Sequence, residues 1–119
     1  MGVYIFRSKH GPYIKVGHYQ GQNAWSRVAH RGFYSCVCPD AIKDRVAAED
    51  VELLAWFPKL TKAEERLIKK KWKKDRIYGK SEWFPLKLLD AVREELMKYD
   101  CSTLELCDYD EAKAVRRRL

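Results

Sequence analysis

The sequence GVYIFRSKHGPYIKVG, residues 2–17, decides the fold of this chain. Residues 3–6 and 13–16 are rich in β-branched and aromatic side chains, which favour β-strands. The intervening segment, SKHGP at residues 8–12, has the composition of a connecting loop. The pattern therefore predicts a hairpin of two antiparallel strands.

The two faces of this hairpin differ in chemistry, because side chains alternate across a strand. One face is aliphatic and is expected to belong to the core: Val3, Ile5, Ile14 and Val16. The other face is aromatic and basic: Tyr4, Phe6, Tyr13 and Lys15. Two phenols and an ammonium are an unusual set for a face whose only role is contact with solvent, so this face is the candidate site.

Length and composition indicate one folded domain. The chain has 119 residues, of which 34% are charged, and no apolar run approaches the roughly 20 residues of a membrane-spanning helix. The first residues lack a signal-peptide pattern, which predicts an intracellular protein, cytoplasmic or nuclear, without a membrane partner. We expect residues 1–99 to form the domain and residues 100–119 a C-terminal extension, either a short helix or a mobile arm.

Positive charge is concentrated in one segment. The formal net charge is +7, and residues 59–80 alone carry ten basic and three acidic side chains, which also gives +7. Such a concentration is typical of a surface that binds the phosphate backbone of nucleic acids. The alternative is a solvated, lysine-rich helix.

Four cysteines raise the question of a disulfide or a metal site. In an intracellular protein the thiols are expected to be reduced. Neither the pair Cys36 and Cys38 nor the pair Cys101 and Cys107 has the usual zinc-finger spacing, although His30 lies near the first pair. Unpaired cysteines are the expected case, with a zinc site as the alternative.

Two helices and a third strand are predicted after the hairpin. Asn23 is a plausible N-cap of a helix over residues 24–31, from which Arg27 and Arg31 project on the side opposite the apolar residues. Residues 51–57, VELLAWF, form an apolar run that predicts a buried strand. Thr61 and Glu64 then make a capping box at the start of a second helix.

The second helix is expected to run from Thr61 to about Lys74. Its predicted apolar face consists of Ala63, Leu67, Ile68 and Trp72. Glu65 lies at the edge of that face, where a carboxylate can be half sheltered and still reach a site. Farther on, residues 79–85 are expected to form a turn or short strand that places Trp83 and Phe84 in the core, and a last helix is expected to start at Pro85.

Tyr4, Lys15-Val-Gly17, Arg27, Glu65 and Glu82-Trp-Phe84 occur in this order within residues 2–85. The set resembles the GIY-YIG nuclease superfamily, in the branch where lysine replaces the second tyrosine and a Glu-Trp-Phe motif follows. The resemblance implies an α+β fold, a small three-stranded antiparallel sheet flanked by helices. The chain departs from the branch at Lys69, where relatives often have histidine.

The resemblance also implies a function, that of a metal-dependent endonuclease that hydrolyses DNA phosphodiester bonds with one Mg²⁺ (or Mn²⁺). Tyr4 or Lys15 would activate water, Arg27 would meet the scissile phosphate, and Glu65 would hold the metal. Tyr13 is the alternative to Lys15, and Glu64, which already has a capping role, is the alternative to Glu65. Nucleic acid would be bound by the basic residues Arg31, Lys69, Lys70, Lys73 and Lys74.

Two other functions fit the same residues. One is a catalytically inactive module of the same fold that binds DNA or RNA, or that serves as a subunit of a larger assembly. The other is an interaction domain that never meets nucleic acid, in which the clustered charge serves solubility. The pattern does not distinguish DNA from RNA and does not indicate an oligomeric state.

Overall fold

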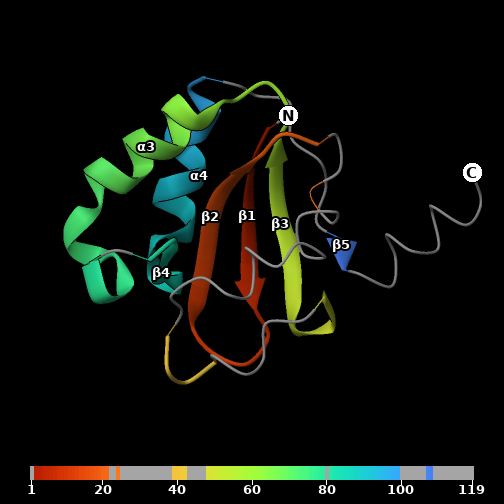
Figure 1. Cartoon of the computed structure of the whole chain (residues 1–119), viewed down its shortest axis with the longest axis vertical. Helices are drawn as coiled ribbons and strands as arrows, with labels where there is room; N and C mark the ends of the chain where they lie inside the picture. The colour runs from red at the N-terminus through yellow and green to blue at the C-terminus, as the bar shows by residue number, and fades with distance from the viewer. Residues whose placement is uncertain are drawn as a thin grey trace, which may run out of the picture.

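The structure is a computed structural model that describes residues 2–21, 24, 39–42, 48–79, 81–99 and 107–108. These residues form an α+β fold, with an antiparallel sheet at its centre (Figure 1). The strands are β1 (Gly2–Ser8), β2 (Tyr13–Tyr19), β3 (Val51–Phe57), β4 (Trp83–Pro85) and β5 (Cys107–Asp108). The helices are α3 (Lys62–Lys71) and α4 (Leu89–Met97), with short 3-10 helices η1 (Ala48–Asp50), η2 (Lys73–Asp75), η3 (Ile77–Gly79) and η4 (Leu86–Leu88).

The sheet has the strand order β4-β2-β1-β3-β5. Its three long strands, β2, β1 and β3, are the predicted hairpin and the predicted third strand, so the α+β class is confirmed. The prediction of only three strands was wrong, because β4 pairs with β2 and β5 pairs with β3. β4 lies within the turn or short strand expected at residues 79–85, but its three residues, like the two of β5, are too few for an alternating pattern to reveal their pairing with the sheet.

The hairpin register places Ile5 opposite Val16 and Tyr4 opposite Gly17. Strand β2 continues to Tyr19, three residues beyond the predicted strand segment 13–16. On the other side of β1, the register with β3 shifts between Ile5 and Phe6. This irregularity lets Leu54 and Ala55 join the same side of the sheet as Ile5.

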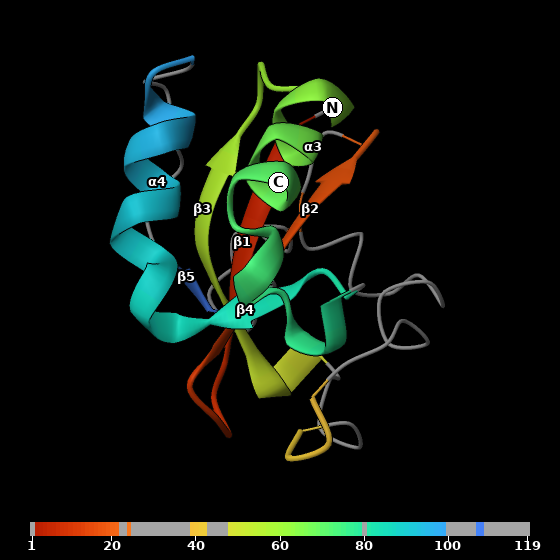
Figure 2. The same ribbon diagram turned by 90° about the vertical axis from the view of Figure 1, so that its left-hand side faces the viewer.

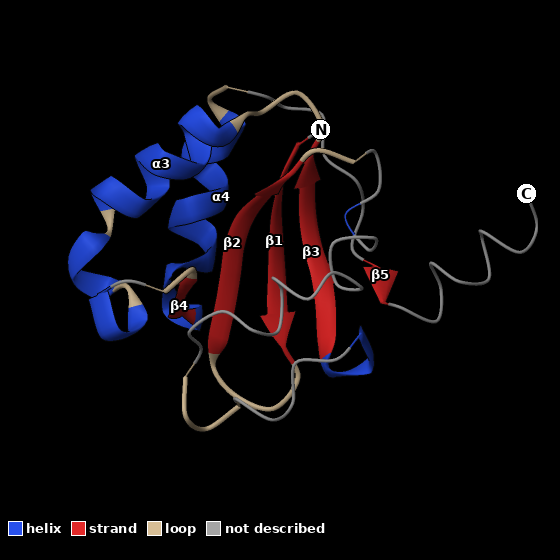
Figure 3. Cartoon of the chain, in the orientation of Figure 1, coloured by secondary structure: helices blue, strands red, loops and turns tan. Residues whose placement is uncertain are grey.

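The aliphatic face of the sheet is covered by the two helices. Figure 3 shows α3 and α4 together on one side of the strands, and Figure 2 shows α3 crossing in front of β1 and β2 with α4 beside it. Ile68 of α3 and Val92 and Leu96 of α4 are fully buried in one cluster with the aliphatic residues of the hairpin. Each such side chain contributes about 1.5–3 kcal/mol of apolar burial, and this layer fixes where α3 lies.

The opposite, aromatic and basic face of the sheet is also buried, although the sequence analysis treated it as a surface. Tyr4 and Phe6 pack in a second cluster with Ala24 and Trp56. The ring centroids of Tyr4 and Phe6 lie 5.2 Å apart. Lys15 on the same face is fully buried. The sheet therefore has two covered faces, and a site near Lys15 has to be reached at the sheet edge.

Helix α3 begins as predicted and presents a different face to the sheet. Its capping box is present at Thr61, and it ends at Lys71, after which η2 continues the chain in a tighter turn. Leu67 is 44% exposed, whereas Glu65 and Ile68 are buried. The predicted apolar stripe was therefore wrong at Ala63 and Leu67, which are both exposed, because the helix is rotated so that a carboxylate takes part in its buried side.

Replacing Thr61 by Ala is expected to destabilise the fold by about 1 kcal/mol, measured by denaturant unfolding. Thr61 accepts a hydrogen bond from the Ala63 N–H, and its own N–H and hydroxyl donate to Glu64. These hydrogen bonds lower the pKa of Glu64. The part of the effect carried by Glu64 should be present above the unfolded-state pKa of the carboxyl and be lost as the pH falls through the folded-state pKa. An effect of the same size on both sides of this range would contradict the assignment.

Several predicted features lie outside the described residues. They include the helix over residues 24–31 beyond Ala24, both of its arginines, and most of the extension at residues 100–119: Arg27, Arg31, His30, Cys36, Cys38 and Cys101. In the extension, residues 107–108 pair as a strand with β3, which the sequence did not predict. Among the described helices, none has the length and apolar character needed to cross a bilayer.

Candidate active site

Tyr4 and Gly17 form the centre of the hairpin. A Cβ atom on Gly17 would lie 2.3 Å from the Tyr4 hydroxyl oxygen and 2.5 Å from its Cζ, so the phenol ring lies directly across the backbone of β2. Real Cβ contacts of this length do not occur, and only glycine can occupy position 17 without a shift. The pairing of tyrosine and glycine therefore fixes the position of the phenol.

Lys15 is the charged residue that the hairpin contributes to the site. It lies opposite Phe6 of β1 and opposite Trp83 of β4, and its side chain is fully buried. Its Nζ atom lies 2.5 Å from Oε2 of Glu82 and 6.0 Å from the centre of the Trp83 ring. A buried ammonium is tolerated only with a partner, and Glu82 is the carboxylate that provides the opposite charge.

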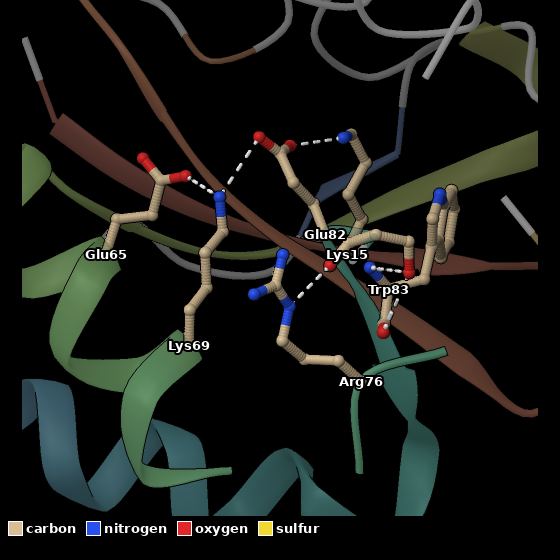
Figure 4. Close-up of polar contacts among 7 residues, drawn as sticks. Lys15, Glu65, Lys69, Arg76, Glu82 and Trp83 are labelled. Carbon is tan, nitrogen blue, oxygen red and sulfur yellow. Dashed lines mark hydrogen bonds and ion pairs between the residues drawn. The ribbon is translucent and has the colours of Figure 1, made fainter. Parts of the chain in front are cut away.

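A chain of four charged side chains extends from Lys15 to α3 (Figure 4). The second oxygen of Glu82, Oε1, lies 3.3 Å from Nζ of Lys69, and the same ammonium also pairs with Oε1 of Glu65 one helical turn earlier. The order along the chain is lysine, glutamate, lysine, glutamate. Positive and negative groups alternate, so every link is attractive.

Among these four side chains, Glu82 is the most exposed and Lys15 the least. Lys15 is 0% exposed, Glu82 28%, Lys69 20% and Glu65 11%. Burial raises the pKa of Glu82, but the charges and hydrogen bonds of Lys15 and Lys69 outweigh it and leave this pKa below its usual value. The carboxylate of Glu82 is therefore ionised at neutral pH.

The backbone around Glu82 is held by hydrogen bonds to β2 and to Arg76, which follows η2. Its carbonyl accepts from the Val16 N–H at 3.0 Å. The preceding residue, Ser81, is fixed by Arg76, whose Nε donates to the Ser81 carbonyl at 2.9 Å. Ser81 in turn accepts through its hydroxyl from the Trp83 N–H at 3.2 Å. These contacts anchor Glu82 at the point where β4 begins.

Trp83 carries a buried donor with no acceptor in the part of the chain that the structure describes. Its indole Nε1 has no hydrogen-bond partner there, although the side chain is fully buried beside Lys15. The ring packs against Ile42, Tyr13 and Ile77. The prediction that Trp83 enters the core is confirmed.

The structure brings together some of the predicted catalytic residues and not others. Lys15 and Glu65 belong to one chain of ion pairs, and Tyr4 lies on the Lys15 face of the hairpin. Tyr13 lies on the same face but packs against Gly11 and Ile42, at the loop end of β2. Of the two alternatives, Lys15 is therefore the residue connected to Glu65, while Arg27 is outside the described residues.

The two neighbouring glutamates of α3 have different partners. The carboxylate of Glu64 binds the N–H and hydroxyl of Thr61, at 2.7 and 2.6 Å, and closes the capping box. Glu65 is buried on the sheet side and pairs with Lys69. Glu64 thus has a structural role at the helix terminus, and Glu65 is the carboxylate of α3 that faces the site.

The lysines predicted to bind nucleic acid also divide into two groups. Lys70, Lys73 and Lys74 are exposed on α3 and η2. Lys69 is held between the carboxylates of Glu65 and Glu82. Lys69 is therefore part of the ion-pair chain, whereas the other three remain available on the surface.

Two residues of the site were missed by the sequence analysis. Glu82 was noted only as part of a motif, and its partnership with Lys15 depends on pairing across 67 residues. His18 follows Gly17 on β2, and burial lowers its pKa while the negative charge of Glu65 opposes that shift. The only sign of Glu82 in the sequence was its place in the Glu-Trp-Phe motif, because the burial of Lys15, which requires a charged partner, was not predicted.

The donor set at Glu65 fits a hard divalent cation in charge and in atom type. Mg²⁺ binds oxygen ligands and usually uses one or two protein carboxylates. Here two carboxylates, Glu65 and Glu82, flank the single ammonium of Lys69. In the described residues no group of three or more His, Cys, Asp and Glu side chains is found. A cation at Glu65 would therefore rely on one or two carboxylates and would have to compete with Lys69.

Comparisons of the whole chain with protein-family models, curated proteins and solved structures return no significant match.

Proposed function

We propose that this chain is a metal-dependent endonuclease of the GIY-YIG type, which hydrolyses phosphodiester bonds of DNA at the edge of β2 where β4 begins. The observation that supports the proposal is the chain of ion pairs from Lys15 through Glu82 and Lys69 to Glu65. It joins the hairpin to α3 at the residues that a nuclease of this type would use. A purely structural core would not need four charged side chains in this place.

In this proposal the residues of the chain divide the chemistry. Tyr4, or Lys15 with its partner Glu82, orients the attacking water, and Arg27 binds the scissile phosphate through its planar guanidinium. Glu65 holds the cation. When bound, a divalent cation supplies positive charge that polarises the phosphate. Lys69 sets the spacing between the Glu65 and Glu82 carboxylates before substrate arrives.

The decisive experiment is a cleavage assay with the full chain. Supercoiled, linear and branched DNA, and single-stranded RNA as a separate substrate, are incubated with Mg²⁺, Mn²⁺ or EDTA. We expect nicking or cutting of DNA with either cation and none with EDTA. No cleavage of any substrate, with binding retained, would replace the proposal by the inactive binding module.

One specific observation favours the binding module as the second candidate. Lys69 pairs with the carboxylate of Glu65 that the cation would need. If that pair is permanent, the fold keeps the geometry of a nuclease and lacks the metal. Mn²⁺ titration of the chain, followed by calorimetry, separates the two cases, because the nuclease binds the ion and the module does not.

Replacing Lys70, Lys73 and Lys74 together by Ala is expected to weaken DNA binding and to flatten its dependence on salt. Each neutralised phosphate contributes about 0.9 to the slope of log affinity against log salt concentration, so the slope should fall in magnitude by roughly 2–3. The measurement is fluorescence anisotropy of a labelled duplex in EDTA at several salt concentrations.

The matched control for this variant removes three exposed lysines outside residues 59–80, namely Lys9, Lys87 and Lys98. The change in net charge is the same. Equal slopes in the two variants would mean that affinity follows net charge alone, and an unchanged slope in the first variant would mean that the lysine-rich segment is a solvated surface.

A further inference from the structure

The charged residues nearest to the reacting centre differ in their access to solvent. The Lys15 side chain is fully buried, so its ammonium does not contact bulk water directly. Glu82, bound to that ammonium, has a side chain that is 28% exposed. This difference in exposure indicates that the Glu82 carboxylate can contact water or substrate, whereas Lys15 contacts the carboxylate.

We propose that Glu82 is a catalytic residue, whose carboxylate accepts a hydrogen bond from the attacking water, and that Lys15 is a positioning residue that holds this carboxylate in place. The inference rests on the proposed nuclease function and reassigns the water-orienting role within it. It applies to the Glu82 side chain at the start of β4, seen between Lys15 and Lys69 in Figure 4.

The geometry of Glu82 suits this role. One oxygen is bound to Lys15 at 2.5 Å and the other lies 3.3 Å from Lys69. A carboxylate offers roughly four acceptor positions, so these two contacts leave acceptor capacity for a water. The hydrogen bond from the Val16 N–H to the Glu82 carbonyl holds the residue in place before substrate binds, which is the condition for electrostatic preorganisation.

The step balances without a further reactant. The water oxygen forms the new bond to phosphorus, and the bond from phosphorus to the leaving oxygen breaks. The water proton is released to bulk water as the bond to phosphorus forms, while Glu82 accepts a hydrogen bond from that water, and the leaving oxygen takes a proton from bulk water. Since two ammonium groups stabilise the ionised carboxylate, Glu82 orients the water more than it removes the proton.

Three variants test the assignment: Glu82→Gln, Lys15→Met, and the double variant. We expect Glu82→Gln to lower kcat about 100-fold, the lower range for a positioned acid or base, and Lys15→Met to lower it about 10-fold, the lower range for a residue that only orients such a group. The double variant should match Glu82→Gln within about twofold, because groups that act as a unit are not additive. Binding of an uncleaved duplex in EDTA should tighten about threefold in Glu82→Gln, since a negative charge facing the phosphates is removed.

Glu94→Gln on the exposed side of α4 is the control for the change in charge. Should Glu82→Gln fail to fold because Lys15 is left buried without its carboxylate, the double variant removes that ammonium, and its kcat relative to Lys15→Met gives the same information. A larger loss in Lys15→Met than in Glu82→Gln would overturn the inference in favour of direct contact by Lys15. If Glu82→Gln changed neither kcat nor the affinity for the uncleaved duplex, the inference would be overturned, and the Lys15–Glu82 ion pair would have only a structural role. A wild-type chain without cleavage would overturn the proposed function itself, and the inference with it.

Discussion

Glu65→Gln is expected to lower the rate of metal-dependent cleavage by about 1000-fold, because a loss of several kcal/mol of charge stabilisation corresponds to that factor. Glutamine keeps the shape of the side chain and removes the anionic ligand. Folding should persist, since Ile68 and the capping box hold α3 in place without Glu65. The measurement is the cleavage rate at saturating Mn²⁺, together with the affinity for Mn²⁺ by calorimetry.

The matched control for this experiment is Glu64→Gln on the adjacent residue. It removes the same charge from the same helix but affects the capping box, so it should lower stability and leave cleavage and Mn²⁺ affinity nearly unchanged. The reverse result, with cleavage lost in Glu64→Gln and retained in Glu65→Gln, would show that the other carboxylate is the ligand.

Gly17→Ala is expected to destabilise the fold by about 3 kcal/mol, the upper range for overpacking a core. The new methyl group would lie 2.3 Å from the Tyr4 hydroxyl, and the Tyr4 ring is fully buried with no exposed side toward which it can turn freely. For a domain of this size the corresponding fall in Tm is roughly 10 °C. Thermal and denaturant unfolding, followed by circular dichroism, measure both quantities.

Gly79→Ala provides the comparison. Gly79 has a positive φ of 69°, and a Cβ there meets nothing within 4 Å. Its substitution should cost only the backbone strain of about 1 kcal/mol. If Gly17→Ala were no more harmful than Gly79→Ala, the tyrosine ring would not lie across β2 as described.

The hairpin was predictable because each of its strands carries its own signal. Alternation in residues 3–6 and 13–16 determines which side chains share a face, and the structure pairs the two strands so that the predicted residues lie together on each face. The third strand was predictable from its apolar run, and α3 from its capping box. The rotation of α3 about its axis was not predictable, because Leu67 and Ile68 are both apolar and only packing against the sheet decides which of them is buried.

The site was predictable only in part, for a related reason. Lys15 and Glu65 could be singled out from their positions within predicted elements. The ion pairs between them depend on how β4 meets β2 and on how α3 lies over the sheet. A short strand was expected near Trp83, but three residues carry too little pattern to predict which strand it pairs with, so the role of Glu82 became visible only with the pairing of Trp83 and Lys15.

The links of the ion-pair chain span very different lengths of sequence. Glu65 and Lys69 lie one turn apart, Lys69 and Glu82 are 13 residues apart, and Lys15 and Glu82 are 67 residues apart. A local opening that separates α3 from the sheet would break the middle link and leave the other two intact. Local openings require no more free energy than global unfolding, and often much less. The proposed nuclease activity should therefore disappear at denaturant concentrations at which the backbone amides of the β1–β2 hairpin are still protected from hydrogen exchange.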